Sequence, residues 1–92
     1  MLRTEFSGQF KRDYRLSIKR NRDPALLQAV LMFLVNEMPL PQKYRDHLLV
    51  NTRKYKEMRE CHIEPDWLLI YKVESNNHIL RLIRTGSHSD LF

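Results

Sequence analysis

The first quarter of the chain switches from a two-residue to a four-residue hydrophobic period. The segment LRTEF, residues 2–6, alternates Leu, Thr and Phe with charged residues, which predicts a short first strand. Ser7 then provides an N-cap hydroxyl, and Phe10, Tyr14 and Ile18 recur every four residues. This spacing predicts a helix that carries one apolar stripe.

A second helix is predicted after a polar break. Asp23 supplies an N-cap carboxylate, and Pro24 suits the first helical position. The segment ALLQAVLMFLVNE, residues 25–37, is apolar on nearly every side, so we expect it to form the most buried helix. The two prolines in residues 38–42 end it, because proline cannot continue the hydrogen-bond ladder.

The second half of the chain has the pattern of a sheet. Residues 42–57 form a polar, basic connector whose sequence favours no particular structure. Residues 58–64 alternate in the manner of a strand, and Pro65 and Asp66 then predict a turn or bulge. Residues 67–73, WLLIYKV, are a continuous apolar run that is typical of a central strand.

A polar turn at residues 74–78 leads into a further strand, HILRLIR, and the tail leaves the sheet at Gly86. The predicted order is strand, helix, helix and then an antiparallel three-strand meander. We therefore expect one α+β domain over residues 1–92, with two N-terminal helices packed on a small, mainly antiparallel sheet.

Positive charge is concentrated early in the sequence. The net charge is +5, and residues 1–22 account for all of it, with seven Lys and Arg residues against Glu5 and Asp13. A second basic cluster lies at residues 53–59. Concentrated positive charge indicates a polyanionic partner, either nucleic acid or an acidic protein segment, although a solvated helix face would have the same pattern.

Several classes of protein are disfavoured by composition. The chain has one cysteine, Cys61, so it forms no intrachain disulfide, which favours a reducing compartment. The longest apolar segment, LLQAVLMFLV, is far shorter than the ~20 residues that span a bilayer. No apolar export segment opens the chain. We expect a cytoplasmic protein without membrane association.

Histidines and carboxylates gather around the predicted meander. His47, His62 and His88 lie in a loop or at a strand end, close in sequence to Glu60 and Asp66. The fourth histidine, at position 78, falls in a turn. Imidazole titrates near neutral pH, so two of these rings can serve as a general base and a general acid.

Strand alternation separates two kinds of side chain in this region. Glu60, His62 and Glu64 share one face, and Cys61 and Ile63 point to the other, towards the core. A Cys–His nucleophile pair is therefore disfavoured. Zinc-binding spacings such as H-E-x-x-H or C-x-x-C do not occur, so we expect no metal and no other cofactor. Metal-free RNA cleavage, which needs a base, an acid and a cation, fits better.

Four segments together resemble the YafQ-type toxins of the RelE superfamily. They are FSGQFKRDY, YRDHLL, RECHIEPDWLLIYKV and LRLIRTGSHSDLF, which follow one another in the same order over nearly the whole chain. The resemblance implies a RelE-like fold and the toxin of a bacterial toxin–antitoxin system. It implies an endoribonuclease that cleaves mRNA in the ribosomal A site, with no cofactor.

The resemblance also implies roles for individual residues. The catalytic group would be His47, His62, Asp66 and His88, with His47 and His88 as base and acid in an order left open. Substrate contacts would come from Arg84 and Phe92, the latter stacking on a base, while Glu60 would be either a hydrogen-bonding partner or a rim carboxylate. The basic residues expected to contact ribosomal RNA or an antitoxin are Lys11, Arg12, Arg15, Lys19 and Arg20.

The implied partners are the 70S ribosome with its mRNA and an acidic, DinJ-like antitoxin. A ribbon-helix-helix antitoxin would link the protein to operator DNA. Two departures from the family pattern concern residues 48–58: Asn51 replaces a usual glycine, and the segment before Arg59 is longer. Two alternatives stay open: a non-catalytic, gyrase-poisoning toxin of the ParE type, and a degenerate binding module with a misplaced His47.

Overall fold

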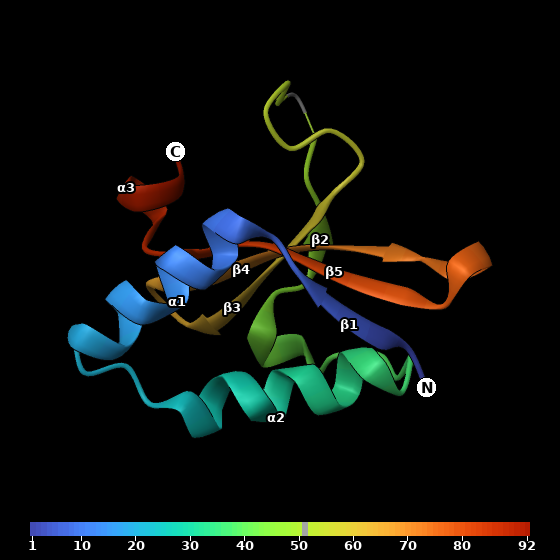
Figure 1. Ribbon diagram of the computed structural model, residues 1–92, viewed down its shortest axis with the longest axis horizontal. Coiled ribbons are helices and arrows are strands. Elements are labelled where there is room, and N and C mark those ends of the chain that lie inside the picture. The colour runs from blue at the N-terminus through green and yellow to red at the C-terminus, as the bar shows by residue number, and fades with distance from the viewer. Residues whose placement is uncertain (51) are drawn as a thin grey trace.

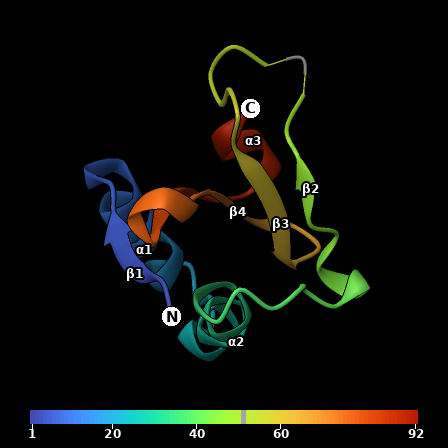
Figure 2. The ribbon, with the colours of Figure 1, turned by 90° about the vertical axis from the view of Figure 1, so that its right-hand side faces the viewer.

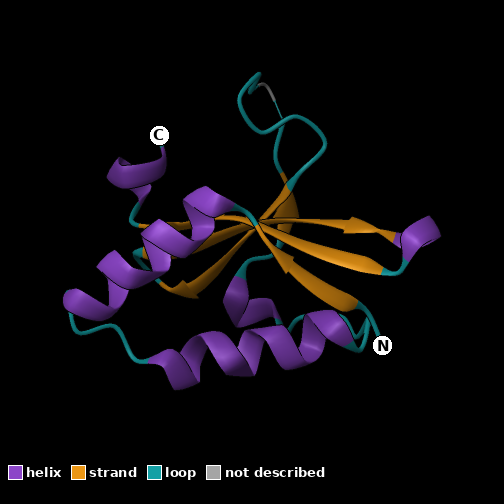
Figure 3. Ribbon diagram, in the orientation of Figure 1, coloured by secondary structure: helices purple, strands orange, loops and turns teal. Residues whose placement is uncertain are grey.

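The computed structural model describes residues 1–50 and 52–92, so the departure at Asn51 lies outside the described residues. Three α-helices and five strands are joined by short loops and two 3-10 turns (Figures 1 and 3). In chain order they are β1 (Arg3–Phe6), α1 (Gly8–Lys19), α2 (Pro24–Val35), η1 (Gln42–Tyr44), β2 (His47–Leu48), β3 (Arg59–Glu64), β4 (Trp67–Glu74), η2 (Ser75–Asn77), β5 (Ile79–Gly86) and α3 (His88–Leu91).

The strands form one sheet in the order β1-β5-β4-β3-β2. The predicted meander of β3, β4 and β5 is confirmed, and both of its pairings are antiparallel. β1 joins the far edge parallel to β5. β2 adds a two-residue edge strand antiparallel to β3, which the sequence did not predict because two residues show no periodicity.

Both predicted helix starts are confirmed by their caps. The Ser7 hydroxyl accepts a hydrogen bond of 2.9 Å from the Phe10 amide. The Asp23 carboxylate accepts one of the same length from the Ala25 amide, with Pro24 in the first turn. These caps satisfy amides that have no partner inside the helix.

The predicted burial of the two helices was partly wrong. On α1 the buried face is Phe10, Asp13 and Ser17, while Ile18 is exposed. On α2, Leu26 and Met32 are exposed despite the apolar composition, so this helix is not buried all round. The fold has too few layers to cover its outer face, and periodicity alone cannot show which side of an apolar helix meets the sheet.

The central strand has a separate apolar cluster on each side. The larger cluster lies between the sheet and the helices α1 and α2, and it includes Cys61, Ile63 and Trp67. The smaller one, with Leu68, Ile70 and Leu91, is covered by α3 and by residues 52–58 before β3, which lie on the side of the sheet away from α2 (Figure 2). Burial raises the pKa of the Cys61 thiol, so this side chain is an inert core residue.

A buried ion pair joins α1 to β5. Asp13 accepts hydrogen bonds from Arg84 Nε at 2.7 Å, from Arg84 Nη2 at 3.2 Å and from the Thr85 amide at 3.2 Å. Burial alone would raise the pKa of Asp13, but the hydrogen bonds from Arg84, Gln9 and Thr85 outweigh it and hold that pKa below its usual value. The pair therefore fixes α1 against the strand that leads into the tail.

Asp13→Asn tests this ion pair. A lowered pKa in the folded state stabilises the fold above about pH 4, and this contribution is lost as the pH falls through the folded-state pKa. At pH 7 we expect the substitution to lower the free energy of unfolding by about 2–3 kcal/mol, because Arg84 loses its charged partner. Urea denaturation should show this difference shrinking between about pH 5 and pH 2. Asp23→Asn is the control, since asparagine caps a helix as well as aspartate. A difference that does not vary with pH would contradict the prediction.

Candidate active site

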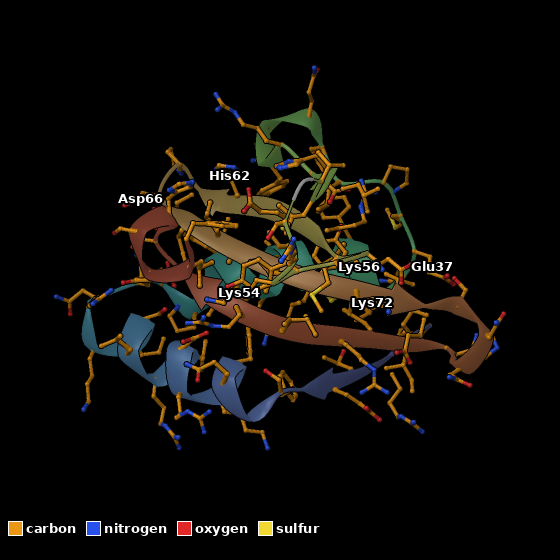
Figure 4. The ribbon with its side chains drawn as sticks, turned by 90° about the horizontal axis from the view of Figure 1, so that it is seen from above. Glu37, Lys54, Lys56, His62, Asp66 and Lys72 are labelled. Atoms are coloured by element: carbon orange, nitrogen blue, oxygen red, sulfur yellow. The ribbon has the colours of Figure 1, made fainter. Side chains whose placement is uncertain are left out.

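Glu60 and His62 lie on the face of the sheet opposite α2, because the alternate residues Cys61 and Ile63 of β3 face the apolar cluster under the helices. Figure 4 looks onto this face, where His62 and Asp66 lie near one another at one end of the sheet. Lys54 and Lys56, from the loop before β3, and Lys72 of β4 lie nearer the middle of the view. Three lysines therefore lie on the same face of the sheet as His62.

A buried carboxylate lies between two of the histidines. Glu60 on β3 is only 6% exposed, and its Oε1 lies 3.5 Å from Nε2 of His47 and 3.5 Å from Nε2 of His62. The strand register explains this arrangement, because His47 pairs directly with Glu60 and His62 lies two residues further along β3. Of the two roles open to Glu60, the structure supports a partner of the histidines.

Backbone carbonyls fix the orientation of both rings. Nδ1 of His47 lies 2.7 Å from the Arg45 carbonyl oxygen, and Nδ1 of His62 lies 3.2 Å from that of Pro65. A carbonyl can only accept, so Nδ1 carries a proton in each ring. Nε2 is then the nitrogen left for proton transfer, and a protonated ring forms an ion pair with Glu60.

The turn between β3 and β4 brings a second group together. The Asp66 carboxylate accepts a hydrogen bond of 3.2 Å from the His88 amide, and the His88 and Phe92 rings lie 5.0 Å apart. Arg22 holds this turn through Glu64 Oε1 at 3.2 Å and the Asp66 carbonyl at 2.8 Å. The predicted turn at residues 65–66 is confirmed, and it links the Glu60 group to the tail.

Tyr55 holds the tail in place. It is almost fully buried, its hydroxyl donates a hydrogen bond of 2.9 Å to the Leu91 carbonyl, and its ring packs edge-on against Phe92 at 5.4 Å. Phe92 itself is about half exposed. A ring that is held from one side and open on the other can stack on a nucleobase.

Arg84 is less available than the sequence indicated. Its Nε and Nη2 both bind Asp13, and its Nη1 faces the Tyr55 hydroxyl at 3.5 Å. Hydrogen bonding to Asp13 raises the pKa of Arg84, so the guanidinium stays charged. All three of its nitrogens thus donate a hydrogen bond within the fold, and only the second N–H of Nη1 and of Nη2 is left for a phosphate.

The basic stripe of α1 is exposed, as Lys11, Arg15 and Lys19 recur on its outer side. Arg20 is partly engaged, since its Nη1 forms an ion pair with Asp90 of α3 at 2.8 Å. His78 lies in the β4–β5 turn with a φ of 55° and joins neither group. Sequence reasoning missed Arg22, Tyr55 and Asp46, which precedes His47, because each acts through contacts between distant segments.

A pocket of about 320 Å³ opens beside His62. Lys43 and Tyr44 of η1 and the following Arg45 line one side of it, and Glu64 at the end of β3 and Pro65 of the β3–β4 turn line another. Within residues 1–50 and 52–92, no group of three or more His, Cys, Asp or Glu side chains is arranged to hold a metal ion. No helix in the same ranges is long and apolar enough to cross a membrane.

The site combines imidazoles next to carboxylates, an open sheet face and a basic helix. These features are typical of a small protein that transfers protons on a polyanionic substrate. Comparison with known proteins gives this class a family. Residues 2–92 match the family described as the bacterial toxin of type II toxin–antitoxin systems, YafQ. The chain belongs to this family, and the resemblance seen in the sequence is confirmed.

Individual relatives agree with this assignment. The chain is 44% identical to an mRNA interferase toxin, YafQ, of Escherichia coli over 96% of its own length and 92% of that protein. A metal-bound toxin from Helicobacter pylori matches with a TM-score of 0.92 and 42% identity, each chain being fully covered. YafQ in the E. coli DinJ–YafQ complex matches with a TM-score of 0.88 and 42% identity over 100% of this chain and 99% of that one.

These relatives confirm the α+β, RelE-like fold and the endoribonuclease class that the sequence predicted. They leave the roles of individual residues untested.

Tyr55→Phe tests whether Tyr55 holds the tail. The variant keeps the ring against Phe92 and removes the hydrogen bond to Leu91, so we expect it to lower the free energy of unfolding by about 1 kcal/mol. Hydrogen exchange should show faster exchange of the Leu91 and Phe92 amides. Tyr14→Phe on α1 is the matched control. Unchanged protection of α3 in Tyr55→Phe would contradict the prediction.

Proposed function

We propose that this protein is the toxin of a bacterial toxin–antitoxin module and an endoribonuclease that cleaves mRNA in the A site of translating ribosomes. The observation that carries the proposal is the buried Glu60 between His47 and His62, with Asp66 and His88 on the adjoining turn and tail. Family membership supports the same function.

The proposed reaction uses the 2′-hydroxyl of the mRNA and needs no metal. A general base takes the 2′-hydroxyl proton, and the 2′-oxygen attacks the adjacent phosphorus. The bond from phosphorus to the 5′-oxygen breaks as a general acid protonates that oxygen. The products are a 2′,3′-cyclic phosphate and a 5′-hydroxyl end.

The two groups of the site suit the two proton transfers. We assign His47 and His88 to the base and the acid, since they come from opposite sides of the β3–β4 turn. His62 and Glu60 then orient His47, and Asp66 orients the backbone that carries His88. Arg84, with Lys43 and Arg45 beside the pocket next to His62, supplies positive charge for the phosphate.

Dependence on the ribosome is supported by the openness of the site. His47, His88 and Phe92 are exposed on the surface, so the mRNA has to be held by another body while it is cleaved. The exposed stripe of Lys11, Arg15 and Lys19 suits phosphates of ribosomal RNA, which position a protein without reading sequence. Translating ribosomes would also place the reaction in the cytoplasm.

The E. coli relative is found in complex with DinJ. By analogy we propose that a DinJ-like antitoxin neutralises this protein and connects it to operator DNA. The alternative of a degenerate module required a misplaced His47, whereas β2 pairs His47 with Glu60. The ParE-type alternative lacks this histidine set. Both observations favour the nuclease.

His88→Ala tests the proposed catalysis. We expect cleavage of a translated message, measured by primer extension, to fall by about 10²- to 10⁴-fold, the usual contribution of general acid–base catalysis. His78→Ala should cleave at the wild-type rate, because His78 lies in a remote turn. Omission of ribosomes should abolish cleavage. A chelator that binds transition metals but leaves ribosomal magnesium in place should leave cleavage unchanged. Full activity of His88→Ala would refute the assignment.

The order of base and acid can be resolved with a modified message. A sulfur in place of the bridging 5′-oxygen leaves without protonation, so it removes the need for the acid. We expect the variant that lacks the acid, either His47→Ala or His88→Ala, to recover cleavage of this message, and the other to stay slow. Recovery by neither variant would mean that the acid is another residue.

A further inference from the structure

The strand that carries His47 has little of its own to hold it. β2 contains two residues at the edge of the sheet, and both side chains are about half exposed, 49% for His47 and 50% for Leu48. Apolar burial therefore contributes little to its position, and short exposed edge elements open readily. Some other contact has to hold the ring of His47 at Glu60.

The residue just before β2 makes that contact. Asp46 accepts hydrogen bonds from Arg59 Nη2 at 2.9 Å and from Arg59 Nε at 3.3 Å. Its Oδ1 also accepts a hydrogen bond from the Tyr71 hydroxyl. A single carboxylate thus joins the start of β2 to β3 and, across it, to β4.

The two partners of Asp46 differ in what they provide. Tyr71 is 2% exposed and belongs to the main apolar cluster, so its hydroxyl is a fixed point. Arg59 pairs with Leu48 in the sheet register, next to the pair of His47 with Glu60. The burial of Tyr71 and the hydrogen bond that it donates to Asp46 both raise the pKa of that phenol, so it stays a donor at neutral pH.

The contacts on either side of His47 complete the constraint. Arg45 has a left-handed φ of 50°, and its carbonyl binds Nδ1 of His47 at 2.7 Å. After β2, the Leu49 amide binds the Met58 carbonyl at 2.9 Å. Tyr44 and Leu49 pack against the two apolar clusters on either side of the segment, and Asp46 fixes the residue next to His47 by polar contacts. A displacement of about 1 Å in a catalytic group can lower a rate 10²-fold.

From this geometry we infer that Asp46 is a positioning residue that holds His47 at Glu60 through its contacts with Arg59 and Tyr71. The inference rests on the proposed function, since it gives His47 a role in mRNA cleavage. Asp46 itself touches no substrate. It acts on the reaction only through the position of His47.

A double-mutant cycle tests the inference. Cleavage of mRNA on translating ribosomes is measured for the wild type, Asp46→Asn, His47→Ala and the double variant. For each protein, the rate at saturating ribosomes and the apparent KM are determined separately. We expect Asp46→Asn to lower the saturated rate about 10- to 100-fold with little change in KM. In the His47→Ala background it should have no further effect, because both changes act on the same group.

Three controls accompany the cycle. Asp23→Asn makes the same chemical change at an exposed helix cap and should cleave at the wild-type rate. Asp46→Glu, which keeps the charge, should recover part of the lost rate. Imidazole ¹H–¹⁵N spectra without substrate should show changed ring signals for His47 and unchanged signals for His78.

The outcomes separate the inference from the function on which it rests. Full activity of His47→Ala would refute the role of His47 in the proposed function. An inactive His47→Ala together with a fully active Asp46→Asn would overturn the inference alone. Equal losses from Asp46→Asn in both backgrounds would also overturn it, since they indicate a general effect on the fold. If thermal melting shows that Asp46→Asn is unfolded, Tyr71→Phe, which removes one hydroxyl from the same contact, replaces it in the cycle.

Discussion

The fold depends on the burial of the first five residues of one strand, β4. From Trp67 to Tyr71 every residue of this strand is at most 2% exposed, so both of its faces need a cover. The helices α1 and α2 cover one face, and the loop before β3 together with α3 covers the other. The second cover consists of the segments that carry Tyr55, His88 and Phe92. The apolar cluster on this side therefore both completes the core and assembles half of the site.

Polar contacts then fix what apolar burial leaves loose. Four arginines each bind a carboxylate on a distant segment. Arg84 of β5 binds Asp13, and Arg59 of β3 binds Asp46, while Arg20 and Arg22 of the loop between α1 and α2 bind Asp90 and Glu64. Exposed ion pairs contribute little to stability. The geometric effect of the three pairs other than Arg84–Asp13 is larger, because they fix the β3–β4 turn, the tail and the edge strand β2, which have little apolar surface of their own. Much of the positive charge counted in the sequence therefore has a structural use.

Prediction from the sequence succeeded where periodicity and local chemistry determine the structure. The caps at Ser7 and Asp23 and the meander were all visible in short windows of sequence. Prediction failed where the outcome depends on what else packs nearby. The exposed side of α2, the pairing of β2 and the engagement of Arg84 by Asp13 are all set by residues far away in the chain. In the site, residue types indicated proton transfer, but the placement of Glu60 between two rings required the sheet register.

The parallel pairing of β1 with β5 has a consequence for the order in which the chain can fold. In the described sheet β1 has one neighbour, and the paired residues are separated by 76 positions, as in Arg3 with Ile79. Contacts of such long sequence separation form late, because the intervening chain must first be ordered. During synthesis, β1 cannot form its pair until the residues of β5 have been made. The sheet therefore cannot be complete before β5 has been made, and β5 ends at Gly86, two residues before His88.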